Sequence, residues 1–108
     1  MNMHNAVIGT VGVDDDTLDR IEHRFPHTQI EPLSELGTIP YRLRLVIIDA
    51  DNSEIQLPEL RERLRRARVN PPIVVFSTRP KTRDDWARKA CITMLPGRLY
   101  TWVKEHRL

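Results

Sequence analysis

Short aliphatic runs alternate along the chain with segments in which apolar residues recur every three or four positions. Five runs have the length and composition of β-strands: residues 6–13, 28–33, 42–49, 70–77 and 91–95. The stretches 45–48 and 73–76 are apolar at every position, which is typical of strands that are buried on both faces of a sheet. The hydrophobic pattern therefore predicts five strands, of which at least two lie in the interior.

Segments of helical period separate these strands. In 14–25, Leu18, Ile21 and Phe25 share one face, and Asp16 is the expected N-cap. In 57–68, Pro58 stands at the first helical position, and the apolar face comprises Leu57, Leu60, Leu64 and Ala67. Residues 82–90 are expected to form a short helix, and 96–108 a closing helix that turns Leu99, Trp102 and Val103 inward. The segment 34–39 has room for only one or two turns, so we expect the second helix to be shortened or replaced by a loop.

This strict alternation predicts an α/β fold with a parallel sheet covered by helices on both faces and joined by right-handed crossovers. The chain of 108 residues has no internal repeat and no linker-like tract, so we expect one domain over 1–108. In such a sheet a ligand site lies beyond the carboxyl ends of the strands. We therefore expect the functional residues at the carboxyl ends of the strands.

Charge, cysteine content and the length of the apolar stretches restrict the class of protein and its cellular compartment. The 17 basic and 15 acidic residues leave a net charge of only +2, so binding to nucleic acid is not demanded. Cys91 is the single cysteine, which excludes an internal disulfide and a zinc site built on several cysteines, and it fits a reducing compartment. No apolar stretch approaches the roughly 18 residues that a membrane span requires. We therefore expect a cytoplasmic protein without membrane contact.

Acidic and hydroxyl side chains gather at the predicted strand ends. Asp14, Asp15 and Asp16 follow the first strand, Asp49 ends the third, and Ser77 and Thr78 end the fourth. Like charges at this spacing either raise a carboxylate pKa or hold a hard cation through oxygen ligands. The sequence thus offers Asp14, Asp15 and Asp49 as a candidate Mg²⁺ site, and we expect no other cofactor.

These strand ends resemble the receiver domain of bacterial two-component response regulators over essentially the whole chain. The resemblance implies a flavodoxin-like, doubly wound, five-stranded sheet in a three-layer α/β/α sandwich. It makes "VGVDDD" the metal-binding acidic pair at Asp14 and Asp15, "LVIID" the candidate phosphoacceptor Asp49, and "PPIVVFS" the candidate hydroxyl Ser77.

Two departures from the family's pattern bear on function. The family has a Lys-Pro pair at the end of the fifth strand, where this chain reads "MLPG", so Leu95 replaces the lysine that pairs with the phosphoryl group. An aliphatic side chain offers neither charge nor hydrogen bond. The aromatic switch residue of the fifth strand is matched by Ile92, which has no ring. The three switch positions are therefore Ser77, Ile92 and Leu95, and the phosphorylation apparatus is incomplete.

The sequence accordingly favours a pseudo-receiver that signals through protein contact and needs no catalysis of its own. Its expected partners are a signalling protein, a histidine kinase, an effector domain or a second copy of the chain. The last helix and strand are a common docking face in receivers, which makes Tyr100 and Trp102 candidate contact residues.

Two alternatives stay open. The first is a genuine Mg²⁺-dependent phosphoacceptor, in which Asp49 is the nucleophile and is autophosphorylated from a kinase or a small phosphodonor. The second is a nucleic-acid-binding module that uses the arginine-rich third helix, within 57–68. The arginines of that segment alternate with Glu59 and Glu62 at spacings suited to intrahelical pairs, which favours a solvated helix face.

Overall fold

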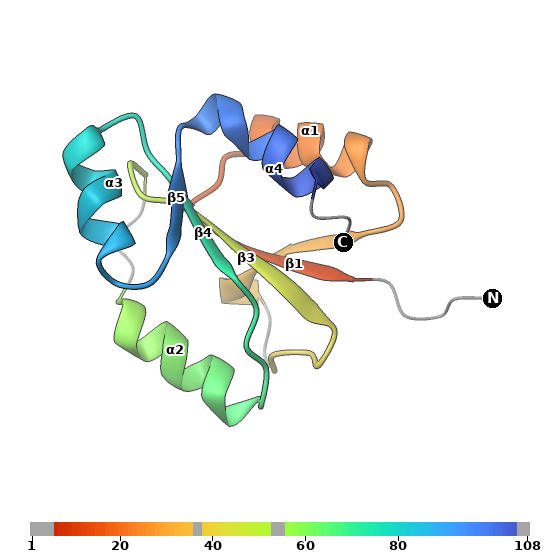
Figure 1. Ribbon diagram of the computed structural model, residues 1–108. Helices are drawn as coiled ribbons and strands as arrows, with labels where there is room; N and C mark the ends of the chain where they lie inside the picture. Colours follow the sequence, from red (N-terminus) through yellow and green to blue (C-terminus); the bar gives the residue numbers. More distant parts are fainter. Residues whose placement is uncertain (1–5, 36–37, 53–55, 106–108) are drawn as a thin grey trace.

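A computed structural model describes residues 6–35, 38–52 and 56–105 of the chain, and the described strands form one parallel sheet (Figure 1). The strands are β1 (Val7–Val11), β2 (Gln29–Pro32), β3 (Leu43–Asp49), β4 (Ile73–Phe76) and β5 (Ile92–Met94). Their order is β2-β1-β3-β4-β5, and all neighbours are parallel. This is the doubly wound, flavodoxin-like order, so the predicted fold class is confirmed.

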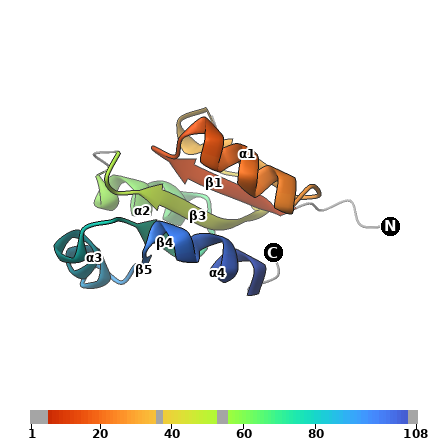
Figure 2. The same cartoon turned by 90° about the horizontal axis from the view of Figure 1, so that it is seen from above.

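Four α-helices cover the two faces of this sheet: α1 (Asp15–Arg24), α2 (Leu57–Arg66), α3 (Pro80–Ala87) and α4 (Leu99–Glu105). Figure 2 shows α1 along β1 and α4 along β4 on the same face. Helix α2 packs on the opposite face, and α3 adds Trp86 to that side beside β5. The three predicted layers are therefore present.

Strand β3 supplies the centre of both hydrophobic layers. Its residues Leu45, Val46, Ile47 and Ile48 have no exposed surface. Because side chains alternate along a strand, Leu45 and Ile47 enter the cluster under α1 and α4, while Val46 and Ile48 enter the cluster under α2. An uninterrupted aliphatic run is thus what a strand buried on both faces requires.

The second helix is replaced by a short turn, as the length of the segment predicted. In the described residues between β2 and β3 (33–35 and 38–42), the structure has the 3₁₀ turn η1 (Leu33–Glu35). Gly9 of β1 makes room for it, since a Cβ at that position would lie 2.6 Å from Cδ2 of the buried Leu33. The side chain of Leu33 therefore covers the sheet where a helix would otherwise lie. The closing helix is also shorter than predicted, because 96–98 form the 3₁₀ turn η2 (Pro96–Arg98) before α4 begins.

Two helices end on residues that adopt a left-handed backbone without being glycine. Arg68, after α2, has φ 57°, and Ala90, after α3, has φ 62°. The amide of Val69 donates to the Leu64 carbonyl (3.2 Å), and the amide of Cys91 donates to the Trp86 carbonyl (3.4 Å), which is the pattern that closes a helix around a left-handed residue. Glycine is the usual residue there because a Cβ is disfavoured at positive φ. Both helix ends are therefore strained.

No helix in the described ranges combines the length and apolar character that crossing a membrane would require.

The strain at Ala90 predicts a stabilising substitution. Ala90→Gly should raise the free energy of unfolding by about 0.5–1 kcal/mol, because glycine adopts the observed φ without a Cβ clash. Urea denaturation monitored by circular dichroism would measure it. The matched control is Ala87→Gly, at the last residue of α3, which should lower stability by up to about the same amount. If both substitutions lowered stability equally, the backbone at Ala90 would carry no strain.

Candidate functional site

The carboxyl ends of β1, β3 and β4 lie next to one another along one edge of the sheet. The strand order reverses between β1 and β3, which is where doubly wound folds bind ligands. The residues that follow these strands are 12–16, 49–52 and 77–79, and they are mostly acidic or hydroxylic. This edge is the candidate site.

Asp14 caps α1, and the predicted cap Asp16 is wrong. The Oδ1 atom of Asp14 accepts a hydrogen bond from the backbone amide of Thr17 at 2.8 Å. The hydrogen bonds with Thr17 hold the pKa of Asp14 below its usual range. Asp15 and Asp16 follow in the first turn of α1, where both are exposed and negative charge favours the helix dipole. The carboxylate of Asp14 therefore stabilises the start of α1.

Asp49 is the last residue of β3 and is partly buried. Burial raises the pKa of Asp49 above its usual range, and the carboxylates of Asp51 and Asp14 raise it further, against a lowering by the Asp51 backbone amide. That amide donates to Oδ1 of Asp49 at 3.0 Å. A carboxyl group that binds its proton more tightly in the folded state than in the unfolded state destabilises the fold when it ionises. Ionisation of Asp49 therefore lowers the stability of the fold, and carboxylates with a raised pKa are frequent at functional sites.

Asp51 is the residue that organises this edge. Its carboxylate accepts hydrogen bonds from the Ser77 hydroxyl (2.6 Å), the Thr78 amide (2.8 Å) and the Thr78 hydroxyl (2.9 Å). The guanidinium of Arg79 lies 4.0 Å from the same carboxylate. The bonds from Ser77 and Thr78 hold the pKa of Asp51 below its usual range. We call the contacts of Asp51 with Ser77, Thr78 and Arg79 the Asp51 clamp.

The Asp51 clamp occupies the hydroxyl proton of Ser77. A hydroxyl group has one proton to donate, and that of Ser77 goes to Asp51. The same oxygen accepts from the Arg79 amide at 3.0 Å, and the Ser77 carbonyl accepts from Arg83 at 2.8 Å. Ser77 is fully buried. In this arrangement it has no proton to donate to a group carried on Asp49.

The turn after β3 is also joined to the loop after β1. The side-chain amide of Asn52 donates to the Gly12 carbonyl at 2.8 Å. Gly12 has φ 71°, a backbone conformation that glycine adopts without strain. The turn 49–52 therefore links the ends of β1, β3 and β4.

The candidate Mg²⁺ ligands are only partly brought together. Asp14 and Asp49 lie at the same edge, close enough for the charge of Asp14 to raise the pKa of Asp49, and both Asp14 and Asp15 are exposed at the start of α1. Across the ranges 6–35, 38–52 and 56–105, no three His, Cys, Asp or Glu side chains form a group suited to a metal ion. Carboxylate oxygens are nevertheless the donors that Mg²⁺ prefers, so Asp14 and Asp49 are the residues that would hold it.

The other two switch positions lie on or just after the edge strand β5, which pairs with β4. Ile92 and Leu95 are exposed to 39% and 48% of their surfaces. Together with Met94 and Trp102 they line a groove of about 440 Å³ between β5 and α4, with Arg83, Arg98 and Glu105 around it. Trp102 lines this groove, while Tyr100 is partly buried against the core under α4. We call this surface, made of Ile92, Met94, Leu95 and Trp102, the β5 groove.

Sequence reasoning did not identify Asp51 as a site residue. A usable signal exists: an Asp-x-Asp pair follows one strand, and a Ser-Thr pair follows the next. Since parallel neighbours end at the same edge, one of the two carboxylates is within reach of the hydroxyls. Which of the two it is depends on the course of the turn.

Comparison of the chain with protein-family models, with curated proteins and with solved structures found no significant match.

The Asp51 clamp predicts a localised loss of stability. Asp51→Ala would leave the buried Ser77 hydroxyl and the Thr78 amide without their acceptor, so the free energy of unfolding should fall by about 1–3 kcal/mol. Amide hydrogen exchange at Thr78 and Arg79 should accelerate at the same time. Thermal denaturation and hydrogen-exchange NMR would measure both effects.

The control is Asp85→Ala, which removes an exposed carboxylate of α3 and should change stability by no more than about 0.5 kcal/mol. Unchanged exchange at Thr78 in the Asp51→Ala protein would contradict the role given to the clamp.

Proposed function

We propose that the chain is a receiver-like signalling module that acts through protein contact and whose phosphorylation apparatus is incomplete. The carrying observation is the Asp51 clamp. Ser77, the residue that the family resemblance assigns to the phosphoryl group, already donates to Asp51. The Ser77 hydroxyl proton, which the resemblance assigns to a phosphoryl group, is therefore already used within the chain.

The other two switch positions support the same proposal. Leu95 stands where the family has the phosphoryl-pairing lysine, and its side chain is directed to the half-exposed β5 groove. Ile92 has no ring to swing between an inner and an outer position. With Ser77 held by Asp51, the loop after β4 would keep one conformation, set by the sequence.

The β5 groove is the surface that we propose for protein contact. It combines exposed aliphatic surface with Trp102, and arginines and a glutamate at its border give a partner polar groups to pair with. Aromatic and aliphatic centres with polar borders are typical of protein interfaces. The proposed partner is a histidine kinase, an effector domain or another signalling protein of the cytoplasm, or a second copy of the chain.

A genuine phosphoacceptor is the competing function. In its favour, Asp49 is a partly buried carboxylate with a raised pKa at the switch point of the sheet, beside Asp14. In-line attack by a carboxylate beside a Mg²⁺ ion would not strictly require the lysine.

An amide NMR titration with Mg²⁺, followed by beryllofluoride as a mimic of the acyl phosphate, separates the two functions. The pseudo-receiver predicts no change at Asp14, Asp49 and Ser77 that needs both additions. The Asp51→Ala protein is the companion sample, because it frees the Ser77 hydroxyl. A response in that variant alone would identify the clamp as the obstacle, whereas a response in the native chain would establish the phosphoacceptor.

The contact surface is tested by site-specific photo-crosslinking in cells. A benzophenone amino acid at Leu95 should give crosslinks to a signalling protein or to a second copy of the chain. The same probe at the exposed Gln29, on the opposite edge strand β2, is the matched control. Equal crosslinking from both positions, or none from Leu95, would contradict the proposed surface.

A further inference from the structure

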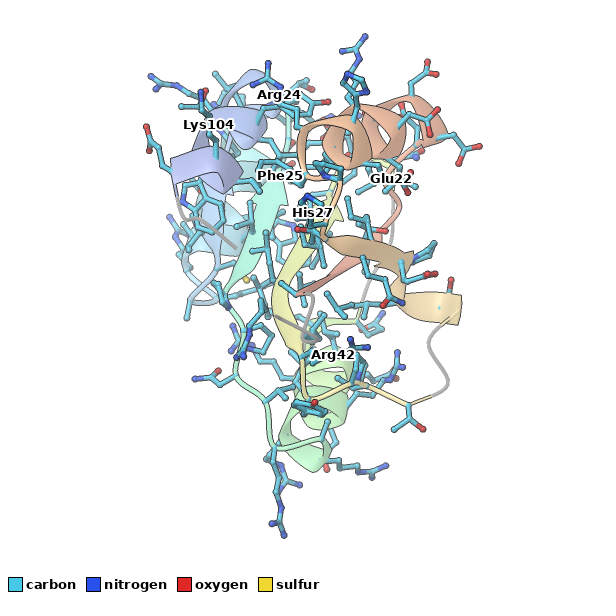
Figure 3. The ribbon with its side chains drawn as sticks, turned by 90° about the vertical axis from the view of Figure 1, so that its right-hand side faces the viewer. Glu22, Arg24, Phe25, His27, Arg42 and Lys104 are labelled. Carbon is cyan, nitrogen blue, oxygen red and sulfur yellow. The ribbon has the colours of Figure 1, made fainter. Side chains whose placement is uncertain are left out.

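Cations collect at the amino-terminal edge of the sheet, opposite to the Asp51 clamp. The helices run antiparallel to the strands, so their last turns meet at this edge. Those turns carry Arg24 in α1, Lys104 in α4, and Arg63, Arg65 and Arg66 in α2. Figure 3 looks onto this edge and shows Arg24 and Lys104 beside α1 and α4, and Arg42 on the side of α2. These basic residues lie at one edge, together with Glu22, whereas Asp14, Asp49 and Asp51 lie at the other (Figure 3).

Part of the basic charge is neutralised within α2. Glu62 accepts hydrogen bonds from Arg65 at 2.6 and 2.9 Å and from Arg66 at 3.2 Å. This confirms the intrahelical pairs that the sequence predicted for Glu62. Arg65 and Arg66, on the outer face of α2, are therefore less available to a nucleic acid than the sequence suggested. Arg61 is not part of these pairs.

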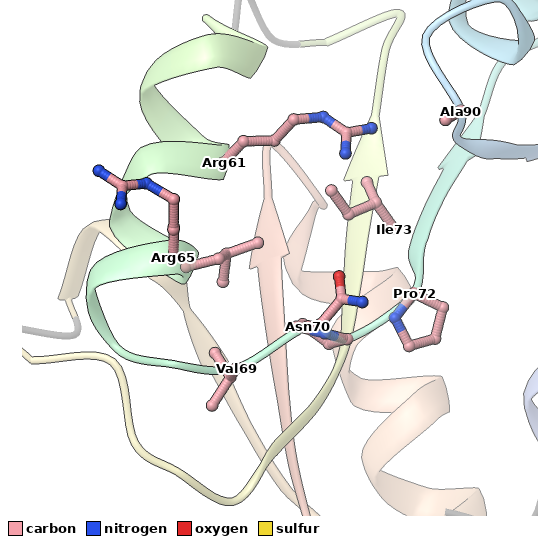
Figure 4. A pocket seen from close by; sticks show the side chains of 9 residues that line it. Arg61, Arg65, Val69, Asn70, Pro72, Ile73 and Ala90 are labelled. Carbon is pink, nitrogen blue, oxygen red and sulfur yellow. The ribbon is translucent and has the colours of Figure 1, made fainter.

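A cleft of about 500 Å³ opens between α2 and the start of β4. Apolar residues (Leu64, Val69, Pro71, Pro72 and Ile73) line it together with Asn70, Arg61 and Arg65, and Arg61 extends over it from α2 (Figure 4). Arg61 is held in place by the Lys89 carbonyl, to which Nη2 donates at 2.5 Å. A guanidinium that is already oriented loses less freedom when it pairs with an anion.

A second hollow, of about 330 Å³, lies against the same connection, 69–72. It is lined by Tyr41, which is exposed to 66% of its surface, and by Arg44 and Arg68. Arg68 has a left-handed backbone here, a conformation that glycine would adopt without the strain caused by a Cβ. Such strain, when retained, is often found at functional positions.

We propose that these two hollows bind single-stranded nucleic acid. Arg44, Arg61 and Arg68 would pair with successive phosphates, and Tyr41 would stack on a base, with the apolar walls beside it. Grooves that combine cations with an exposed aromatic ring are the usual means of holding single strands without sequence preference. One small anion would fill only one hollow, whereas a strand can follow both, and an acidic peptide would gain nothing from the tyrosine face. This binding site is independent of the function proposed for the β5 groove.

The test is fluorescence anisotropy with labelled oligo-dT and oligo-U of about 12 nucleotides, a length within the known site sizes of single-strand binders. Affinity should fall as salt increases, with a log–log slope that reports about three phosphate contacts. Tyr41→Ala should weaken binding about fivefold to a hundredfold through lost stacking. Arg68→Gly should weaken binding and reduce the salt slope by about one contact. Because this variant relieves backbone strain, unfolding cannot explain its loss of affinity.

The matched control is Lys81→Gln, which removes one positive charge from the first turn of α3, where that helix begins at the carboxyl edge. It should change affinity less than twofold. Poly-glutamate and uridine monophosphate should bind more weakly than the oligonucleotides. The proposal is overturned if no oligonucleotide binds at low salt, if Lys81→Gln weakens binding as much as Arg68→Gly, or if poly-glutamate or the mononucleotide binds as tightly as the oligonucleotides.

Discussion

Burial of β3 on both faces is the constraint on which the rest of the structure depends. Four consecutive aliphatic residues without exposed surface need helices above and below them, and parallel neighbours on either side. Parallel pairing then requires every connection to cross a face of the sheet, so all strands end at the same edge. The gathering of Asp14, Asp49 and Ser77 at one place is thus a consequence of hydrophobic burial, before any chemistry is considered.

At that edge, carboxylates compete for few hydrogen-bond donors. Asp51 takes the donors of Ser77 and Thr78, and Asp14 takes the amide of Thr17. Asp49 receives a backbone amide and remains partly buried between two like charges, so its proton is the hardest of the three to remove. Asp14 and Asp51 therefore make structural hydrogen bonds, and Asp49 is the carboxylate with a raised pKa.

The fold could be predicted from the sequence because burial on two faces leaves a clear pattern. The aliphatic runs of β1, β3 and β4 and the leucine stripe of α2 were predicted within two or three residues. The cap of α1 was wrong because three consecutive aspartates are equivalent caps by residue type, and only the path of the chain brings Asp14 to the Thr17 amide. Asp51 was missed for a similar reason, since the turn after β3, not the residue type, selects the carboxylate that meets Ser77.

The close packing of Leu33 on Gly9 carries an evolutionary consequence. A covering helix could shift to accommodate a larger residue in β1, whereas here a Cβ at position 9 would lie 2.6 Å from Cδ2 of Leu33 and 3.3 Å from Cδ1 of Leu43. The two positions are therefore matched in volume, and neither can change alone without a clash or a void. In diverging descendants of this chain, growth at position 9 should be accompanied by shrinkage at position 33. A covariation of that kind would show that the contact between the turn and β1 constrains both positions.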